Sequence, residues 1–185
     1  MTVRNDMNAQ PHLDEIHSRA RAIKLLALDV DGVLTDGKLY FSNSGEEMKS
    51  FSTLDGQGIK LLQNSGVIVA LISARSSQLV SNRASNLDIQ YVLQGSENKL
   101  ETLTGIMQKL ALDFSEIAYV GDDLPDLACI RKVALGVTVP NGHWLIRKMA
   151  FCCTTCSGGA GAVREVCDWI LLAQGNFDDA VADYF

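Results

Sequence analysis

Two aspartates, Asp29 and Asp31, stand one residue apart directly after a continuous apolar run, and Gly32 follows them at once. Side chains two positions apart on an extended chain point the same way, so we expect both carboxylates to face one small pocket. Neighbouring carboxylates repel each other, and each resists ionisation unless a cation or a shared proton relieves the charge. The pair therefore predicts a divalent metal site with oxygen ligands, and Mg²⁺ fits such ligands best.

A solvated turn and a calcium-binding loop are the alternatives for this acidic pair. Acidic residues are common in turns that follow strands, so the turn stays open at this point. A calcium loop of the EF-hand type needs glycine at its sixth position and glutamate at its twelfth. Counted from Asp29, those positions hold Leu34 and Tyr40, which excludes the calcium loop.

Polar residues also follow three later apolar segments: Ser73, then Lys99, then the pair Asp122 and Asp123. Each has an ordinary structural alternative, namely a helix cap, a solvated lysine and an acidic turn. Together, at one edge of a sheet, they would supply a carboxylate nucleophile, a second carboxylate, a hydroxyl donor, a cation and further acids. Phosphoryl transfer requires these groups for positioning, charge neutralisation and proton movement.

The elements that must position these residues alternate between strands and helices. Strands are expected over 23–28, 67–72, 89–93, 117–120 and 134–139, and helices over 12–22, 59–64, 76–86, 97–110 and 161–173. The stretch Asp55-Gly56-Gln57-Gly58 is expected to break the chain before the second helix. This alternation predicts an α/β fold, with a mostly parallel sheet covered by helices on both faces.

A glycine turn between residues 38–42 and 46–53 predicts a β-hairpin that projects near the pocket. An isolated hairpin is only marginally stable, so we expect its apolar side chains to pack against something, such as another subunit. Between Gly37 and Ser73 there is room only for this hairpin and a helix. A separate cap domain does not fit there, so a neighbouring subunit or a large substrate must exclude water.

The composition predicts one domain over residues 1–185, with a polar extension over 1–20, the hairpin flap over 38–53 and a tail over 175–185. A net charge of -6 argues against a nucleic-acid partner. No apolar run approaches a membrane span, and the five cysteines, an odd number, favour reduced thiols in the cytoplasm. Cys152, Cys153 and Cys156 are expected to be ordinary thiols, because a zinc site needs about four ligands.

The stretch Asp-Val-Asp-Gly-Val-Leu-Thr-Asp-Gly, then Ser73, Lys99 and Gly-Asp-Asp-x-x-Asp, resembles the four motifs of haloacid dehalogenase superfamily phosphatases. The chain more closely resembles the 3-deoxy-D-manno-octulosonate 8-phosphate phosphatase family, through the hairpin, Asp-Gly-x-Gly-Ile, Gln-Gly-x-x-Asn-Lys and Gly-Ala-Val-Arg-Glu-Val. The resemblance extends from Ile23 to Gln174. It implies a capless, three-layer Rossmann-like fold and a Mg²⁺-dependent phosphatase of lipopolysaccharide biosynthesis.

The resemblance also implies roles for the acidic residues. Asp29 would be the nucleophile that forms an aspartyl phosphate. Asp31 would protonate the leaving sugar oxygen and then activate water. Mg²⁺ would be held by Asp29, the main-chain carbonyl of Asp31 and Asp122, with Asp123 and Asp126 as further ligands or as support for the ligands.

Ser73 and Lys99 would hold the phosphoryl oxygens, and Arg75 would meet the sugar acid. The position of Arg75 is basic in octulosonate phosphatases of the resembled family and acidic in relatives that act on nonulosonate 9-phosphates. A guanidinium can pair with the carboxylate of a sugar acid, whereas a surface arginine that caps a helix is the alternative. Arg83 is a second candidate. Leu54, Ala74 and Ala160 depart from the family pattern, mainly at the sugar end of the site.

The resemblance further implies a homotetramer in which hairpins and C-terminal tails reach neighbouring active sites. Three alternatives remain: a phosphatase of a nonulosonate 9-phosphate or another small phosphate, a signalling receiver, and a non-catalytic oligomerisation module. Receivers carry their phosphorylated aspartate after the third strand, where this chain leads to Lys99. The intact set of Asp29, Asp31 and Lys99 disfavours the non-catalytic module.

Overall fold

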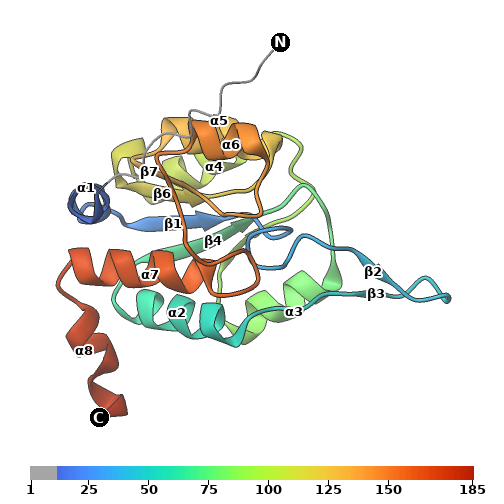
Figure 1. Cartoon of the computed structure of the whole chain (residues 1–185), viewed down its shortest axis with the longest axis horizontal. Coiled ribbons are helices and arrows are strands. Elements are labelled where there is room, and N and C mark those ends of the chain that lie inside the picture. The colour runs from blue at the N-terminus through green and yellow to red at the C-terminus, as the bar shows by residue number, and fades with distance from the viewer. Residues whose placement is uncertain (1–11) are drawn as a thin grey trace.

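The computed structural model describes residues 12–185, and residues 1–11 lie outside the described part. Six parallel strands form a sheet in the order β5-β4-β1-β6-β7-β8 (Figure 1). Their bounds are β1 (Leu25–Leu28), β4 (Ile68–Ile72), β5 (Tyr91–Leu93), β6 (Ile117–Val120), β7 (Leu135–Thr138) and β8 (Cys152–Cys153). The chain winds outward from β1 in both directions, and ligands of open parallel sheets bind at such a reversal.

Helices cover both faces of the sheet, so the predicted three-layer α/β architecture is confirmed (Figure 1). One layer holds α1 (Leu13–Ala20), α2 (Thr53–Asn64), α3 (Gln78–Asn86) and α7 (Ala162–Ala173), and the other holds α4 (Lys99–Leu110), α5 (Leu127–Lys132) and α6 (Trp144–Met149). Each layer packs on its own apolar cluster. The short helices α6 and α8 (Phe177–Val181) were not predicted from the sequence.

Strand β1 shows why the first apolar run is continuous. Leu26 and Leu28 pack toward the layer of α2 and α7, whereas Leu25 and Ala27 pack toward the layer of α4 and α5. Side chains alternate across a strand, so a strand between two helix layers needs apolar residues at every position. Burying each leucine contributes about 1.5–3 kcal/mol, and this core holds the end of β1 in place.

The predicted chain break at Asp55–Gly58 is wrong, because this stretch lies inside α2. A Cβ on Gly56 would lie 2.3 Å from Nη2 of Arg83, and a Cβ on Gly58 would lie 2.8 Å from Cδ of Arg164. The two glycines therefore make room for side chains of α3 and α7 that pack closely against α2. Tertiary packing outweighs the low helix propensity of glycine here.

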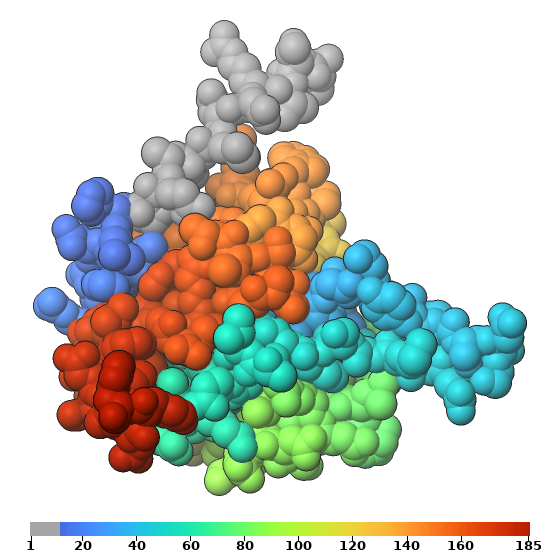
Figure 2. All heavy atoms as spheres, turned by 60° about the horizontal axis from the view of Figure 1, so that its bottom comes forward, coloured from blue at the N-terminus to red at the C-terminus, as the bar shows by residue number. Residues whose placement is uncertain are grey.

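The predicted hairpin is present as β2 (Tyr40–Phe41) and β3 (Glu47–Met48), two short antiparallel strands that project from the body (Figures 1 and 2). In the single chain, Phe41 is 60% exposed and Met48 is 59% exposed, so packing of these side chains against another subunit stays a prediction. Only farther along, at Phe51, does this segment pack against the core. The tip of the hairpin therefore offers an exposed apolar surface.

The first described helix and the C-terminal tail lie away from the hairpin. The predicted extension over 1–20 falls partly outside the described residues, and its described end is α1, where Ile16 and Ala20 are buried. The tail after α7 forms α8 at the end of the molecule opposite the hairpin (Figures 1 and 2). No helix of the described part, residues 12–185, has the length and apolarity needed to cross a membrane.

The late cysteines belong to the fold. Cys152 and Cys153 form β8, and Cys152 is buried. Burial raises the pKa of the Cys152 thiol to about 12, so this side chain stays a thiol and packs as a small apolar group. Cys129, Cys152, Cys153, Cys156 and Cys167 are all free of disulfides.

Candidate active site

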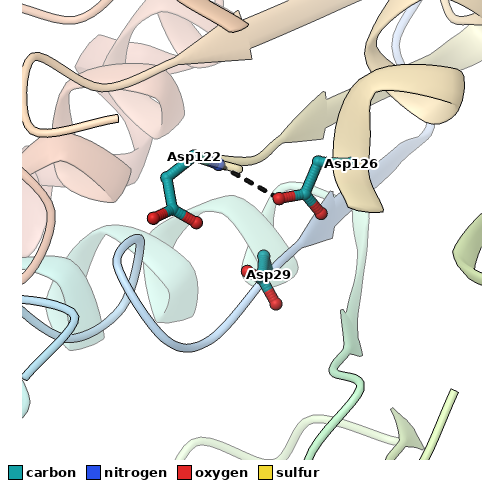
Figure 3. Close-up of side chains that lie close together, drawn as sticks. All are labelled: Asp29, Asp122 and Asp126. Carbon is teal, nitrogen blue, oxygen red and sulfur yellow. Dashed lines mark hydrogen bonds between the residues drawn. The ribbon is translucent and has the colours of Figure 1, made fainter. Parts of the chain in front are cut away.

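Three carboxylates meet where β1 and β6 end (Figure 3). Asp29 directly follows β1, Asp122 lies in the loop after β6, and Asp126 ends the short 3₁₀ turn Leu124–Asp126. One carboxylate oxygen from each lies within 4.8 Å of the others. The two strands are paired in parallel, Leu28 beside Val120, so the sheet itself brings these acids together.

Lys99, the first residue of α4, supplies positive charge to this group. Its Nζ lies 2.7 Å from Oδ1 of Asp29 and 2.7 Å from Oδ1 of Asp126. Burial opposes the charged form, but the two carboxylates outweigh it and raise the pKa of Lys99. The lysine therefore stays protonated beside Asp29 at neutral pH.

Both oxygens of the Asp126 carboxylate accept hydrogen bonds. Its Oδ1 accepts from Lys99 and from the Tyr119 hydroxyl at 2.8 Å, and its Oδ2 accepts from the N–H groups of Asp122 and Asp123 at 3.1 and 3.2 Å. A carboxylate has about four acceptor positions, and all four are used. Asp126 therefore positions Lys99 and the loop after β6 instead of offering an oxygen to a cation.

Asp29 and Asp122 are the carboxylates suited to a divalent cation. Oδ1 of Asp122 is buried and has no hydrogen-bond partner among the described residues, which is costly for a carboxylate unless a cation binds it. Burial and the charge of Asp126 raise the pKa of Asp29 to about 8, against the opposing effect of Lys99, and raise that of Asp122 to about 6. Hard oxygen ligands of this kind fit Mg²⁺.

The loop after β1 is shaped by a glycine and fastened by an amide. Gly32 has φ +95°, and a Cβ there would lie 2.0 Å from Oδ2 of Asp122, so only glycine lets the two loops approach. The Asn141 side chain donates to the Gly32 carbonyl at 3.0 Å and accepts from the Gly158 N–H at 2.7 Å. These contacts fix the loop that carries Asp31.

Asp31 has different partners from Asp29, although both carboxylates were expected to face one small pocket. The Asp31 carboxylate forms a short ion pair with Nζ of Lys49, and its other oxygen lies 3.9 Å from Nε of Arg75. The Lys49 side chain is 1% exposed. Asp31 is thus outside the group of three carboxylates and faces the base of the hairpin.

Sequence reasoning missed Glu47 and Lys49. Glu47 lies on β3, the second hairpin strand, and Lys49 directly follows that strand. Glu47 accepts from Nη2 of Arg75 at 3.2 Å and from Oγ of Ser77 at 3.2 Å, and it lies 3.4 Å from Nζ of Lys49. Their spacing places them on one face of an extended chain, a signal that could have pointed to them. Tyr119 was also missed, although a tyrosine in a buried aliphatic strand needs a partner for its hydroxyl.

The other predicted residues lie as follows. Ser73 is buried after β4, the strand beside β1, and its Oγ accepts from the Arg75 N–H at 3.2 Å. Arg83 lies on α3, where it donates to the Ser52 carbonyl at 3.0 Å. Asp123 is exposed and accepts from the Leu124 N–H at 2.8 Å.

Comparison with known proteins found no matching family model. An Escherichia coli protein described as 3-deoxy-D-manno-octulosonate 8-phosphate phosphatase KdsC is 46% identical over 166 residues, which cover 90% of this chain and 88% of that protein. The Moraxella catarrhalis phosphatase of the same description, solved with magnesium, phosphate and KDO, has a TM-score of 0.92 at 46% identity and covers 94% of this chain and 100% of its own. A putative haloacid dehalogenase superfamily hydrolase from Legionella pneumophila has a TM-score of 0.90 at 42% identity. The match covers 93% of this chain and 94% of that one.

Proposed function

The chain belongs to the 3-deoxy-D-manno-octulosonate 8-phosphate phosphatase family of the haloacid dehalogenase superfamily, and we propose that it hydrolyses this phosphate ester with Asp29 as the nucleophile. One observation carries the assignment of the nucleophile. Asp29 stands buried at the end of the central strand, with the protonated Lys99 at 2.7 Å and the orphaned oxygen of Asp122 in the same group. An ionised carboxylate held beside a cation can attack a phosphorus atom whose oxygens the cation also neutralises.

In the first step, an Asp29 oxygen forms a bond to phosphorus while the bond between phosphorus and the sugar oxygen breaks. Asp31 donates a proton to the departing alkoxide. In the second step, the ionised Asp31 takes a proton from water, and the water oxygen attacks phosphorus and releases Asp29. Lys99 and the Ser73 hydroxyl hold the phosphoryl oxygens in both steps.

Asp29, the main-chain carbonyl of Asp31 and Asp122 would hold Mg²⁺. The orphaned buried oxygen of Asp122 supports this ligand set, and the magnesium in the Moraxella catarrhalis relative supports the choice of ion. When bound, Mg²⁺ supplies positive charge that favours the ionised carboxylates and withdraws charge from the phosphoryl group. Asp126, Tyr119 and Asp123 support the loop that carries Asp122.

Arg75 is proposed to pair with the sugar-acid carboxylate. Its side chain is 46% exposed and lies beside Asp31, where the leaving sugar would sit. Arg83 is proposed to support the sugar end indirectly, because it holds the Ser52 carbonyl at the base of the hairpin. A basic residue at position 75 favours octulosonate over nonulosonate esters, which remain the second candidate substrates.

Assembly as a homotetramer is also proposed, with residues 1–185 as a single phosphatase domain. The exposed hairpin tip, at Phe41 and Met48, supports burial against a neighbouring subunit. Phe185 is fully exposed at the end of a tail that lies far from the hairpin of its own chain. The tail is therefore proposed to contact the active site of a neighbouring subunit. The cysteines, none of which is in a disulfide, favour the reducing cytoplasm. A protein that light scattering shows to be a monomer, and that is fully active in the phosphatase assay, would refute the tetramer.

The test of function measures phosphate release from octulosonate 8-phosphate, a nonulosonate 9-phosphate and p-nitrophenyl phosphate with Mg²⁺. We expect the highest kcat/KM for octulosonate 8-phosphate. In Asp29→Asn, kcat should fall at least about a thousandfold for every ester, because the nucleophile is lost. Equal kcat/KM values across the panel would withdraw the substrate, and an active Asp29→Asn would withdraw the nucleophile.

A further inference from the structure

The Glu47 carboxylate receives the contacts that a bound carboxylate ligand would receive. Arg75 donates to one of its oxygens at 3.2 Å, Ser77 donates to the other at 3.2 Å, and Nζ of Lys49 lies at 3.4 Å. The three donors come from the loop after β4 and from the base of the hairpin. Charge-assisted contacts from a guanidinium and a hydroxyl are the usual means of recognising a carboxylate.

The donors around Glu47 are already in use. Nη2 of Arg75 and Oγ of Ser77 both donate to its carboxylate. A sugar acid whose carboxylate came to Arg75 and Ser77 would need the same two donors and would stand beside the negative charge of Glu47. Like charges at close range disfavour one another, so one of the two carboxylates must leave.

Glu47 is the carboxylate that can leave. Asp31 is fixed by the buried Lys49 and by its place in the loop that Asn141 fastens, whereas Glu47 belongs to β3, a strand of two residues. The hairpin projects into solvent (Figure 2), and the side chains of Phe41 and Met48 are mostly exposed. Rotation of Glu47 into water therefore disrupts no core packing.

We propose that Glu47 is an internal competitor that occupies the subsite for the substrate carboxylate, formed by Arg75 and Ser77, until the sugar acid displaces it. This inference rests on the proposed function. An acid that restores both contacts compensates for the release of Glu47, whereas a phosphate ester without a carboxylate does not. Glu47 thus selects sugar acids, and Ser77 is a further substrate-binding residue.

The experiment compares Glu47→Gln with Glu46→Gln, its exposed neighbour, whose contact is with Ser44 in the turn of the hairpin. Octulosonate is used as an inhibitor of p-nitrophenyl phosphate hydrolysis, and KM is measured for octulosonate 8-phosphate. The apparent affinity for octulosonate is proportional to the fraction of enzyme in which Glu47 does not occupy the subsite. Glu47→Gln should therefore lower the inhibition constant of octulosonate about fivefold. The ratio of KM for octulosonate 8-phosphate to KM for p-nitrophenyl phosphate should also fall.

Two further variants make the outcome decisive. Glu46→Gln should match the wild type, and Ser77→Ala should raise the octulosonate inhibition constant, since it removes a donor that both carboxylates use. A raised or unchanged inhibition constant in Glu47→Gln would overturn the proposal. If the wild type cleaves p-nitrophenyl phosphate but not octulosonate 8-phosphate, the proposed substrate fails. The inhibition constants then still decide whether Glu47 competes with a carboxylate.

Discussion

The proposed phosphate end of the site lies on buried strand ends, whereas the proposed sugar end lies beside an exposed hairpin. Asp29, Lys99 and Asp126 are at most 6% exposed and hold one another through contacts of 2.7 Å. At the sugar end, the Arg75 side chain is 46% exposed and the Glu47 side chain is 21% exposed. Buried, mutually paired groups suit phosphoryl transfer, which depends on preorganised charge, and exposed loops are where residues that select a substrate are commonly found.

Among the variants that keep the proposed nucleophile, the largest effect should come from distorting the phosphate end at Gly32. In Gly32→Ala, the new Cβ would overlap Oδ2 of Asp122, which lies 2.0 Å from its position. Displacing a reacting group by about 1 Å costs on the order of a hundredfold in rate. We therefore expect kcat for octulosonate 8-phosphate and for p-nitrophenyl phosphate to fall together by at least that factor.

Gly66→Ala is the matched control for backbone strain. Gly66 has φ +91°, close to the +95° of Gly32, but no atom lies within 4 Å of its added Cβ. This variant should lose about 1–2 kcal/mol of unfolding free energy and keep its kcat. A Gly32→Ala enzyme as active as Gly66→Ala would show that the phosphate end tolerates movement.

Charge reversal at the sugar end should separate the two regions. Arg75→Glu is expected to raise KM for octulosonate 8-phosphate at least about tenfold, because a charge-assisted contact is replaced by repulsion. The effect on p-nitrophenyl phosphate should be much smaller. Arg131→Glu, an exposed charge reversal on α5, is the control. An unchanged KM in Arg75→Glu would remove Arg75 from the substrate pocket.

A smaller effect concerns Mg²⁺ and pH. Burial and Asp126 raise the pKa of Asp29 to about 8 in the metal-free protein, so between the ordinary carboxyl pKa and 8 the folded state binds more protons than the unfolded state. Stability without metal therefore falls as pH rises through this range. Mg²⁺ needs the ionised carboxylates, so its affinity rises with pH.

Thermal unfolding at fixed Mg²⁺ measures this linkage. The Mg²⁺-dependent increase in Tm should be about 2–4 °C larger at pH 8 than at pH 6. Arg75→Glu should show the same difference, because the sugar end provides no metal ligand. A larger increase at pH 6 would contradict the assignment of Asp29 and Asp122 as ligands.

The positions of the residues at the proposed phosphate end could be largely foreseen from the sequence, because they follow continuous apolar strands. Parallel strands end at the same edge of a sheet, so Asp29, Ser73 and Asp122 could be placed together before their contacts were known. The length of each apolar run identified the strands within two residues at their ends. Patterns within single segments were enough for this part of the fold.

The sugar end could not be foreseen to the same extent. Lys49 reaches Asp31 only because the hairpin folds back over the loop after β1, and two-residue strands leave no periodic pattern that fixes such a return. The glycines of α2 were misread for a related reason. Gly56 and Gly58 accommodate side chains from distant helices, and local propensity carries no information about those contacts.

The most direct test traps the phosphoryl group on the enzyme. The protein is mixed with octulosonate 8-phosphate and Mg²⁺, quenched in acid during turnover and treated with borohydride, which reduces an acyl phosphate to an alcohol. Peptide mass spectrometry should then show residue 29 converted to homoserine and Asp31 unmodified. Reduction at Asp31, or an unmodified Asp29 in an enzyme that turns over, would contradict the account.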